Sequence, residues 1–342
     1  AVRAGYQVLL LAPTDLLARQ HHGTLTALLK GHLPTSRIHL LVGALTAAQK
    51  TAIKAAASQG TADILIGTHA LFQDKVIFHD LGLIIIDEQH KFGVEQRVKL
   101  LSKAEHPDLL VMTATPIPRS LTMTLFGDMS VSRLKSKPAT RPEIVTIIKS
   151  SSNIHEVMGS MERKIASNEK IYWVCPLIEQ DDKDESCLRD IATRFHALDE
   201  RFPGKVGLIH GKLKGDAKDE VMQKFKDGAF SILVATTVIE VGIDVSDATL
   251  IVIENAEKFG LAQAHQLRGR VGRGQLQSHC ILLYEYLAGM AKTRLELMRN
   301  SNDGFYIAEQ DLLLRGGGEI LGTKQSGQVE FYFADLARDI DL

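Results

Sequence analysis

Short, uninterrupted runs of apolar residues alternate along the chain with longer stretches in which apolar residues recur at helical spacing. In the first part of the chain, strands are predicted at residues 7–12, 38–42, 63–66, 83–86 and 109–112. Amphipathic helices are predicted between several of these strands, at residues 16–30, 46–58 and 94–102. Such a regular alternation indicates an α/β fold, in which a parallel sheet carries helices on both faces.

The alternation breaks at residues 135–142, where two prolines among basic and small residues predict a linker. It then restarts, with strands predicted at 144–148, 171–174, 206–209, 231–235, 250–253 and 280–284 and helices at 154–167, 188–201 and 214–226. Beyond about residue 287, the chain combines a helical stretch with a glycine-rich segment at 315–318. We therefore predict three parts, at residues 1–137, 143–286 and 287–342.

The composition limits the class of protein. The chain has 342 residues, of which 45% are hydrophobic and 24% charged, as in ordinary globular domains. Its formal net charge of −1 gives no overall attraction to nucleic acid, so such binding must come from local patches. Cys175, Cys187 and Cys280 lie far apart without metal-ligand spacing, and no apolar run approaches the length of a membrane span. We expect reduced thiols and a cytoplasmic location.

The apolar run at residues 83–86 is the most informative single stretch, because it ends abruptly on Asp87 and Glu88. Such a run is typical of a parallel strand buried on both faces, whose carboxyl end opens into the crevice where α/β sheets bind ligands. Two carboxylates there favour a nucleotide site, in which Asp87 holds the Mg²⁺ of the nucleotide and Glu88 polarises the attacking water. The alternative is a solvated acidic turn.

Small hydroxyl-bearing residues follow three other predicted strands of the same sheet, in segments 12–14, 67–69 and 113–116. Hydroxyl groups at such ends can hydrogen-bond phosphates, and neighbouring helix N-termini add N–H donors. Threonine is also an ordinary helix N-cap, so each segment alone leaves that alternative open. Three such segments beside Asp87 and Glu88 favour a phosphate-binding edge of the sheet.

A regular arginine pattern, Q-x-x-G-R-x-G-R, occupies residues 266–273. Arg270 and Arg273 are three residues apart, which corresponds to one helical turn, and a glycine precedes each of them. Forked, permanently charged guanidinium groups suit a triphosphate whose charge shifts in the transition state. The alternative is a basic helix end near solvent.

Another predicted strand end lies at residues 235–244. Thr236 and Thr237 can meet a nucleic-acid phosphate there, and Asp244 can meet a ribose hydroxyl or an arginine. A purely structural turn is the alternative.

These segments resemble the motifs of superfamily 2 helicases. The resemblance covers motifs II, III and VI at residues 87–90, 113–115 and 266–273, and motifs Ia, Ib and V at residues 12–14, 67–69 and 235–244. Longer stretches, at 87–97, 112–119 and 315–327, are similar to the RecG family of bacterial ATP-dependent DNA helicases, the last of them to its TRG translocation motif. Gly317 and Lys324 stand where that motif has proline and arginine. The transcription-repair coupling factor shares the tail, but Gln89 favours the RecG family.

The resemblance implies two RecA-like parallel-sheet domains, the first truncated at its N-terminus, followed by a helical hairpin and loop. It implies catalytic roles for Asp87, Glu88, Arg270 and Arg273, with Asp87 reaching Mg²⁺ through the nucleotide. The residues implied in nucleotide binding are Gln266, Gly242, Asp244 and Thr113. Those implied in DNA binding or coupling are Pro13, Thr14, Thr68, His69, Thr115, Thr236, Thr237, Arg315 and Gln325.

The resemblance also implies an activity, the ATP- and Mg²⁺-dependent remodelling of stalled replication forks and Holliday junctions in DNA repair and recombination. Branched double-stranded DNA is the implied partner, with single-strand binding protein as a further one, for a monomer at the bacterial nucleoid. No G-x-x-x-x-G-K-[ST] loop occurs in this sequence, so we expect a motor fragment that is inactive as an ATPase alone, with the loop and an OB-fold domain upstream. A transcription-repair coupling translocase and a nucleic-acid-binding module that does not hydrolyse ATP are the alternative functions.

Overall fold

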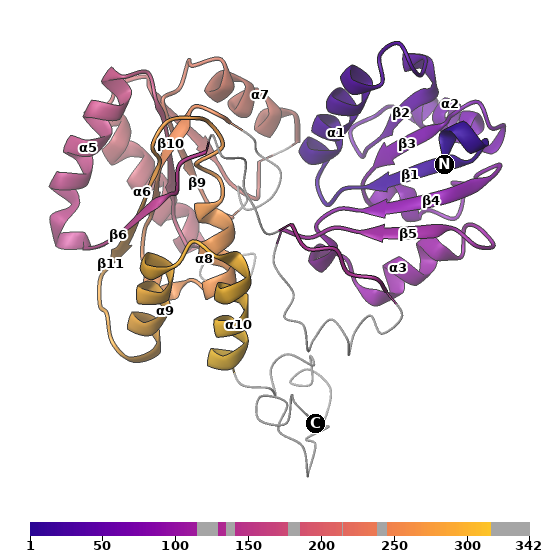
Figure 1. Ribbon diagram of the computed structural model, residues 1–342. Helices are drawn as coiled ribbons and strands as arrows, with labels where there is room; N and C mark the ends of the chain where they lie inside the picture. Colours follow the sequence, from indigo (N-terminus) through magenta and orange to yellow (C-terminus); the bar gives the residue numbers. More distant parts are fainter. Residues whose placement is uncertain (115–128, 135–140, 177–184, 214, 238–244, 316–342) are drawn as a thin grey trace, which may run out of the picture. The chain divides into compact units, whose positions relative to one another are not determined.

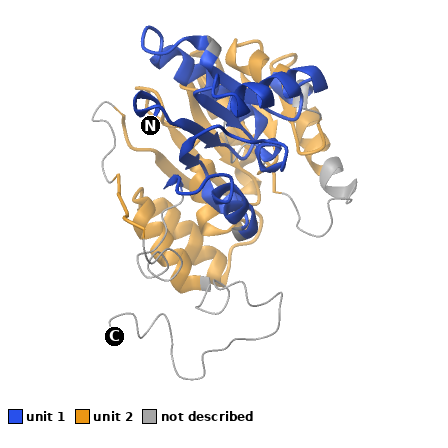
Figure 2. Cartoon of the chain, turned by 90° about the vertical axis from the view of Figure 1, so that its right-hand side faces the viewer, with its two compact units in different colours: residues 1–114, 214–219, 241–243 blue, residues 115–213, 220–240, 244–342 orange. Residues whose placement is uncertain are grey.

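The computed structural model of the chain forms two compact units, which are described separately below (Figures 1 and 2). It describes residues 1–114, 129–134, 141–176, 185–213, 215–237 and 245–315. Unit 1 is built on residues 1–114, and unit 2 contains most of the remaining described residues. The predicted linker at 135–142 lies almost wholly outside the described residues.

Unit 1 contains a wholly parallel five-stranded sheet in the order β2-β3-β1-β4-β5. Its strands are β1 (Gln7–Leu11), β2 (Ile38–Leu41), β3 (Ile64–Gly67), β4 (Leu81–Ile86) and β5 (Asp108–Val111). Its helices are α1 (Asp15–Leu28), α2 (Ala47–Ser58) and α3 (Val94–Leu101). Each predicted strand and helix of this part is confirmed, with ends displaced by one or two residues.

The two faces of this sheet are covered unequally. Side chains of α2 and α3 pack on one face, in a cluster that includes Leu9, Ile84 and Leu100. On the opposite face the helical side chains come mainly from α1, and there Leu83 and Ile85 are only half-buried. Leu110, paired with Ile85 in the sheet, is exposed. The prediction that strand 83–86 is buried on both faces is therefore wrong for the face that carries Leu83 and Ile85.

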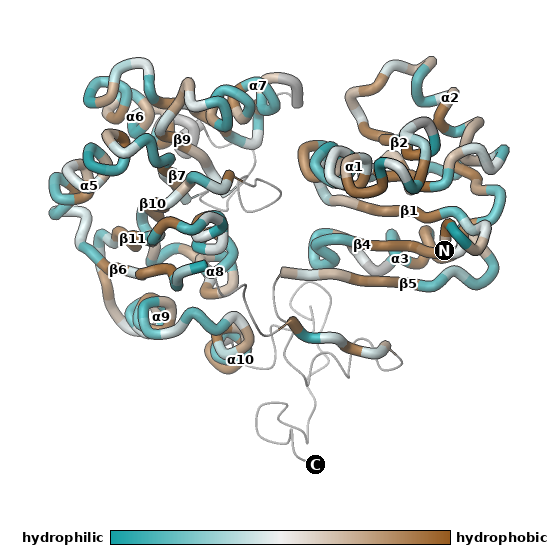
Figure 3. Tube along the Cα trace, turned by 45° about the horizontal axis from the view of Figure 1, so that its top comes forward, coloured by the Kyte–Doolittle hydropathy of each residue, from teal (hydrophilic) through white to brown (hydrophobic). Residues whose placement is uncertain are grey.

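Unit 2 contains a parallel six-stranded sheet in the order β6-β11-β10-β7-β9-β8. Its strands are β6 (Val145–Ser150), β7 (Lys170–Val174), β8 (Val206–Ile209), β9 (Ile232–Ala235), β10 (Ala248–Ile253) and β11 (His279–Tyr284). The helices that accompany them are α5 (Ile154–Ala166), α6 (Glu185–Arg201), α7 (Gly215–Lys226) and α8 (Leu261–Arg268). All were predicted except α8. Figure 3 shows hydrophobic residues along strands of the sheets, for example along β1 and β4 of unit 1.

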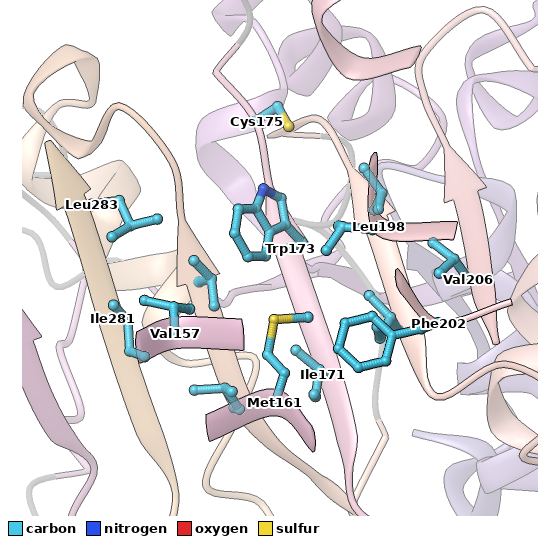
Figure 4. Close-up of a cluster of buried hydrophobic side chains, with 14 of the residues drawn as sticks. Val157, Met161, Ile171, Trp173, Cys175, Leu198, Phe202, Val206, Ile281 and Leu283 are labelled. Atoms are coloured by element: carbon cyan, nitrogen blue, oxygen red, sulfur yellow. The ribbon is translucent and has the colours of Figure 1, made fainter. Parts of the chain in front are cut away.

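The core of unit 2 is organised around Trp173, which is fully buried in the middle of β7. Figure 4 shows its ring among side chains of α5, such as Met161, and of α6, such as Leu198. On the other face of β7, Tyr172 contacts Phe225 of α7, with ring centroids 5.2 Å apart. Burial on both faces explains why the β7 sequence shows no alternation of polar and apolar residues.

The predicted helical hairpin of the tail is confirmed for its two helices, α9 (Gly289–Asn300) and α10 (Gly304–Arg315). A three-residue connector joins them, and both lie beside α8 (Figure 1). The glycine-rich segment and the residues after it lie outside the described residues. No helix in the described part of the chain is both long enough and apolar enough to cross a bilayer.

Each unit contains a copy of one local structure. In unit 1, β4 is followed by an acidic residue, then by a residue with positive φ, a 3-10 helix and the eight-residue α3. In unit 2, β10 is followed in the same order by Glu254, Asn255, a 3-10 helix and the eight-residue α8. The sequence Lys-Phe-Gly ends both segments. Residues 87–93 are called the unit 1 turn, and residues 254–260 the unit 2 turn.

Candidate functional site

The strand order of unit 1 brings the predicted site segments to one edge. β3, β1, β4 and β5 are adjacent and parallel, so the segments that follow them leave from the same end of the sheet. After β1 the chain continues to β2 on one side, and after β4 it continues to β5 on the other. The carboxyl ends of β1 and β4 therefore flank a topological switch point, the position where open α/β sheets bind ligands.

Asp87 lies at this switch point and is held from three directions. Its backbone N–H donates to the Leu11 carbonyl at the end of β1, at 2.9 Å. Its Oδ1 accepts the Glu88 backbone N–H at 2.9 Å, and its Oδ2 lies 2.7 Å from Nε2 of His21 in α1. Both carboxylate oxygens thus have a partner, which fixes the orientation of the side chain.

Glu88 has a strained backbone. Its φ of 48° and ψ of 55° place it in the left-handed region, which costs an L-residue about 1–2 kcal/mol. Its side chain is 12% exposed, and its Oε2 accepts the Ala114 N–H at 3.3 Å and lies 3.7 Å from Nδ1 of His90. Such strain is concentrated at functional sites. The Ala114 contact joins the segment after β4 to the one after β5, which also carries the half-buried Thr113.

The segments after β1 and β3 are joined to each other. Thr14 is the N-cap of α1 and accepts the Leu17 N–H at 3.3 Å, so it performs the structural role considered for it. The buried Thr68 donates its hydroxyl to Oδ1 of Asp15 at 3.0 Å. Thr14 retains a hydroxyl proton for a further acceptor, and the half-buried Pro13 precedes it.

The ring of His69 packs against the unit 1 turn. It is exposed, and its centroid lies 5.7 Å from that of Phe72 and 5.7 Å from that of Phe92. Phe92 belongs to the unit 1 turn, so the segments after β3 and β4 form one surface beside the switch point.

The arginine motif of unit 2 is not helical where the sequence predicted it to be. Helix α8 ends at Arg268 with Gly269 as its C-cap, and Gly272 has a φ of 76°. The spacing of Arg270 and Arg273 is therefore not one helical turn, because the chain leaves the helix before them. Arg270 is 6% exposed, whereas Arg273 is half-buried and its Nε donates to the Gly269 carbonyl at 3.3 Å.

Glycine is required in this motif for two reasons. The positive φ of Gly272 is unfavourable for other residues, and a Cβ there would lie 2.8 Å from the side chain of Ile144. A Cβ on Gly274 would lie 2.5 Å from the Ser246 carbonyl oxygen. The glycine spacing thus reflects a tight turn against neighbouring segments, while Gln266 is buried within α8.

Arg268 is a functional candidate that the sequence analysis missed. It is 2% exposed and donates to the carbonyls of Met298 at 2.6 Å and Ser301 at 2.9 Å, at the C-terminal end of α9. It also donates to Oγ1 of Thr146 at 3.2 Å and lies 3.0 Å from Nδ1 of His265. These bonds satisfy carbonyls that the end of a helix leaves without partners and so join the arginine motif to the tail hairpin.

Burial around Arg268 shifts the pKa values of two ionisable groups. Burial lowers the pKa of the Arg268 guanidinium from its usual value, although the nearby Cys280 opposes this effect. Burial also raises the pKa of the Cys280 thiol to about 12. Cys175 and Cys280 are buried and form no disulfide among the described residues.

Glu254, at the start of the unit 2 turn, is a second residue that was missed. Its carboxylate accepts Nε and one terminal nitrogen of Arg194 in α6, a bidentate pair. Trp173 donates its indole N–H to Oε2 of Glu254 at 2.7 Å. The backbone N–H of Glu254 donates to the Val174 carbonyl at 2.9 Å, as that of Asp87 does to Leu11. Glu254 thus occupies in unit 2 the place of Asp87 in unit 1.

The remaining predicted residues are described only in part. Thr236 is buried, and its hydroxyl has no hydrogen-bond partner among the described residues, whereas Thr237 is half-buried. Thr115, Gly242, Asp244 and Gln325 lie outside the described residues, as does the side chain of Arg315 at the end of α10.

The oxygen ligands at the switch point fit a magnesium ion that arrives with a nucleotide. No cluster of three or more His, Cys, Asp or Glu side chains that could hold a metal occurs in the described part of the chain. Mg²⁺ characteristically takes only one or two carboxylates and completes its shell with phosphates and water. Asp87 and Glu88 offer that kind of donor set.

Two family profiles match the two units. The DEAD/DEAH box helicase profile matches residues 1–124, and the helicase conserved C-terminal domain profile matches residues 152–275. With the two parallel sheets and the acidic segment after β4 in unit 1, these matches define the class, which is that of proteins with the two α/β domains of DEAD/DEAH box helicases.

Relatives narrow the class further. Proteins named ATP-dependent DNA helicase RecG are 46% identical in Streptococcus pneumoniae, over 100% of this chain, and 48% identical in Acidithiobacillus ferridurans, over 99% of it. The profile of RecG domain 3, C-terminal, matches residues 301–342. The chain belongs to the RecG family. It spans about half the length of these relatives, 50% and 49% respectively.

Solved structures agree with this assignment. A RecG structure bound to a three-way DNA junction has a TM-score of 0.76 and 40% sequence identity, over 98% of this chain and 43% of that one. The yeast protein Dbp5, solved with RNA and ADP BeF3, has a TM-score of 0.63 and 16% identity, over 88% of this chain and 75% of that one. The second match shows a shared fold alone.

Proposed function

We propose that the chain is the motor region of an ATP-driven double-stranded DNA translocase that remodels stalled replication forks and Holliday junctions. The observation that carries this proposal is the meeting of Asp87 and Glu88, at the β1–β4 switch point, with the segments after β3 and β5. Membership of the RecG family supports it, as does the DNA junction bound in a RecG structure. We assign the motor domains to residues 1–137 and 143–286 and the translocation element to residues 287–342.

The nucleotide would be ATP with Mg²⁺. Asp87 would hold the ion through the nucleotide, and Glu88 would orient the attacking water. Bound Mg²⁺ would neutralise part of the phosphate charge. Arg270 and Arg273 would meet charge that develops on the phosphates, and the remaining nucleotide contacts are assigned to Gln266, Gly242, Asp244 and Thr113. The constrained Asp87 carboxylate and the strained Glu88 backbone support these roles, because both place charged oxygens at the ligand-binding edge.

DNA would be bound mainly through its backbone, as expected for a motor without sequence preference. The residues assigned to DNA binding and coupling are Pro13, Thr14, Thr68, His69, Thr115, Thr236 and Thr237. The contacts that join the segments after β1, β3 and β4 support a continuous surface beside the nucleotide edge. We further assign branched DNA and single-strand binding protein as partners of a monomer at the bacterial nucleoid.

The tail would transmit the motor stroke to DNA without taking part in hydrolysis. Arg315 and Gln325 are the residues that we assign to this step. Arg268 has four hydrogen-bonding contacts, one to Met298 of α9 and one to its C-cap Ser301, and they support a mechanical link between the arginine motif and the hairpin.

Arg273 offers a direct test in a protein of the relatives' full length that carries this chain, called the full-length protein below. Removing an arginine that stabilises transition-state charge costs roughly 10³–10⁵ in kcat. Arg273→Ala should lose most of its fork-stimulated ATPase activity while still binding nucleotide. Arg273→Lys should also fail, because the forked geometry is lost.

Arg163, an exposed arginine of α5, provides the matched control, and Arg163→Ala should hydrolyse ATP normally. Normal turnover by Arg273→Lys would contradict the proposed role. The 342-residue chain alone should release almost no phosphate with or without forked DNA, because its sequence contains no phosphate-binding loop.

A further inference from the structure

His21 is a polar residue of unit 1 to which the function described so far gives no role. It lies in α1, about two turns after the N-cap Thr14, and its Nε2 lies 2.7 Å from Oδ2 of Asp87. α1 follows β1, whereas Asp87 follows β4, so the contact bridges the switch point between these strands. A side chain in this position can set the geometry of the carboxylate that faces the nucleotide.

The contact completes the immobilisation of Asp87. The Glu88 N–H alone would leave the carboxylate free to rotate about that single hydrogen bond, and His21 removes this freedom by engaging the second oxygen. An ionised carboxylate has about four acceptor positions, so two donors leave room for a metal ion or its water ligands. The arrangement therefore fixes the carboxylate without blocking it.

An ordinary surface ion pair is the simplest alternative, and such pairs contribute little. Two observations argue against it. The side chains of His21 and Asp87 are only 26% and 18% exposed. The equivalent residue of unit 2, Glu254, is likewise held by a basic side chain, Arg194, from the described helix that follows the neighbouring strand. In both units, a basic side chain from a helix therefore holds the first carboxylate of the turn.

α1 also connects Asp87 with the proposed DNA surface. The first turn of this helix carries Asp15, which accepts the hydroxyl of Thr68 from the segment after β3. His21 contacts Asp87 from farther along the same helix. One rigid element thus joins a residue of the proposed DNA surface to the carboxylate of the nucleotide site.

We propose that His21 is a positioning residue, which orients the Asp87 carboxylate for nucleotide-bound Mg²⁺ and ties it to the N-terminal end of α1. This inference rests on the proposed function. Outer partners of metal ligands typically contribute about 10- to 100-fold to metal affinity or activity. His21→Ala should therefore weaken the apparent affinity for Mg²⁺ about tenfold, while nucleotide binding without Mg²⁺ stays unchanged.

The experiment measures binding of a fluorescent ADP analogue to the full-length protein, at fixed pH, as Mg²⁺ is titrated. His21→Gln keeps an N–H donor near the position of Nε2 and should restore the Mg²⁺ midpoint to within about threefold of wild type. His22, the next residue of α1, provides the control, because its Nε2 lies 3.4 Å from the Ile38 carbonyl and away from the site. His22→Gln should behave as wild type, and thermal unfolding checks that all variants are folded.

A second readout needs no nucleotide. In the 342-residue chain, the side-chain ¹⁵N resonances of His21 should move in Asp87→Asn, whereas those of His22 should not.

Equal Mg²⁺ midpoints for His21→Ala and wild type would overturn the inference, and so would a failure of His21→Gln to recover the midpoint. If nucleotide binding by the wild-type protein did not depend on Mg²⁺, the proposed function itself would be overturned. Failure of the inference and failure of the proposed function are therefore distinguishable.

Discussion

The unit 1 turn and the unit 2 turn share a backbone and differ in chemistry. In both, the first N–H bonds to the last carbonyl of the neighbouring strand, the second residue has a φ near 50°, and Lys-Phe-Gly leads into an eight-residue helix. The first two residues of the turn are Asp87 and Glu88 in unit 1. In unit 2 they are Glu254 and Asn255.

The carboxylates of the two turns are also held differently. Glu254 is neutralised by a bidentate arginine and an indole N–H, while Asp87 has one imidazole and one backbone N–H. The same backbone therefore carries different partners in the two units. We propose a nucleotide site for the turn of unit 1, and the contacts of Glu254 indicate a structural role for the turn of unit 2.

The largest expected difference between the turns is in catalysis. Glu88→Gln removes the carboxylate to which we assign the orientation of water. The change should lower the ATPase rate of the full-length protein by about 10²–10⁴, the usual contribution of a general base. The converse change at the equivalent position of unit 2, Asn255→Asp, adds a carboxylate and should leave the rate near wild type. Phosphate release with saturating forked DNA measures both. A comparable loss in Asn255→Asp would show that the two turns are not functionally distinct.

Stability should show the opposite ranking. Glu254→Gln leaves Arg194 poorly neutralised, and breaking a buried pair costs about 3–5 kcal/mol, so about 2–4 kcal/mol is expected for this partly exposed one. Asp87→Asn should change the free energy of unfolding by less than about 1 kcal/mol, because the asparagine amide still offers an acceptor and a donor to the two partners of this side chain. Urea unfolding of the chain, followed by far-ultraviolet circular dichroism for both units and by Trp173 fluorescence for unit 2, measures both losses. Equal stability of the two variants would contradict the inference that the contacts of Glu254 stabilise unit 2.

The helices that follow the turns end on different residues, Leu101 in unit 1 and Arg268 in unit 2. Arg268→Leu removes the donors that bond to the carbonyls of Met298 and Ser301. A buried polar group without a hydrogen-bond partner costs about 1–3 kcal/mol of stability. Amide exchange in α9 should accelerate correspondingly, while that in α5 should not. In the full-length protein, fork unwinding should fall more than ATP hydrolysis. A proportional fall would place the tail within the hydrolytic machinery.

The smallest expected effect concerns the positive φ at the second position of each turn. Asn255→Ala should destabilise the chain by about 1 kcal/mol, because alanine lacks the local hydrogen bonding that lets asparagine adopt this conformation. Glu88→Gly should stabilise it by up to about 1 kcal/mol and yet abolish turnover. Urea unfolding midpoints provide the measurement. A stability loss in Glu88→Gly would show that the Glu88 side chain supports the fold.

The sequence predicted every strand of both sheets because each is a short apolar run bounded by polar or turn-forming residues. It did not predict α8, whose buried residues include Leu261, Ala264, Gln266 and Arg268 and therefore form no single apolar stripe. That omission led to the wrong prediction that Arg270 and Arg273 share a helical turn.

The place of Asp87 and Glu88 at the ligand-binding edge was predictable, because an apolar run that ends on two carboxylates marks the carboxyl end of a strand. His21, Glu254 and Arg268 were not, because each acts on a partner that only the fold brings near it. His21 is 66 residues from Asp87, and the Arg268 side chain reaches a carbonyl 33 residues away. No local pattern in the sequence marks such pairs.

The buried thiol of Cys280, beside Arg268, allows local opening between α8 and β11 to be measured by chemical modification. With a pKa of about 12, Cys280 is almost wholly protonated at neutral pH, and alkylating reagents attack the thiolate. Its modification therefore requires an excursion in which the side chain reaches water. The rate of alkylation at a series of reagent concentrations then measures how often this region opens. The alkylation rate of a native cysteine thus reports the opening rate of the region that connects the arginine motif to the hairpin.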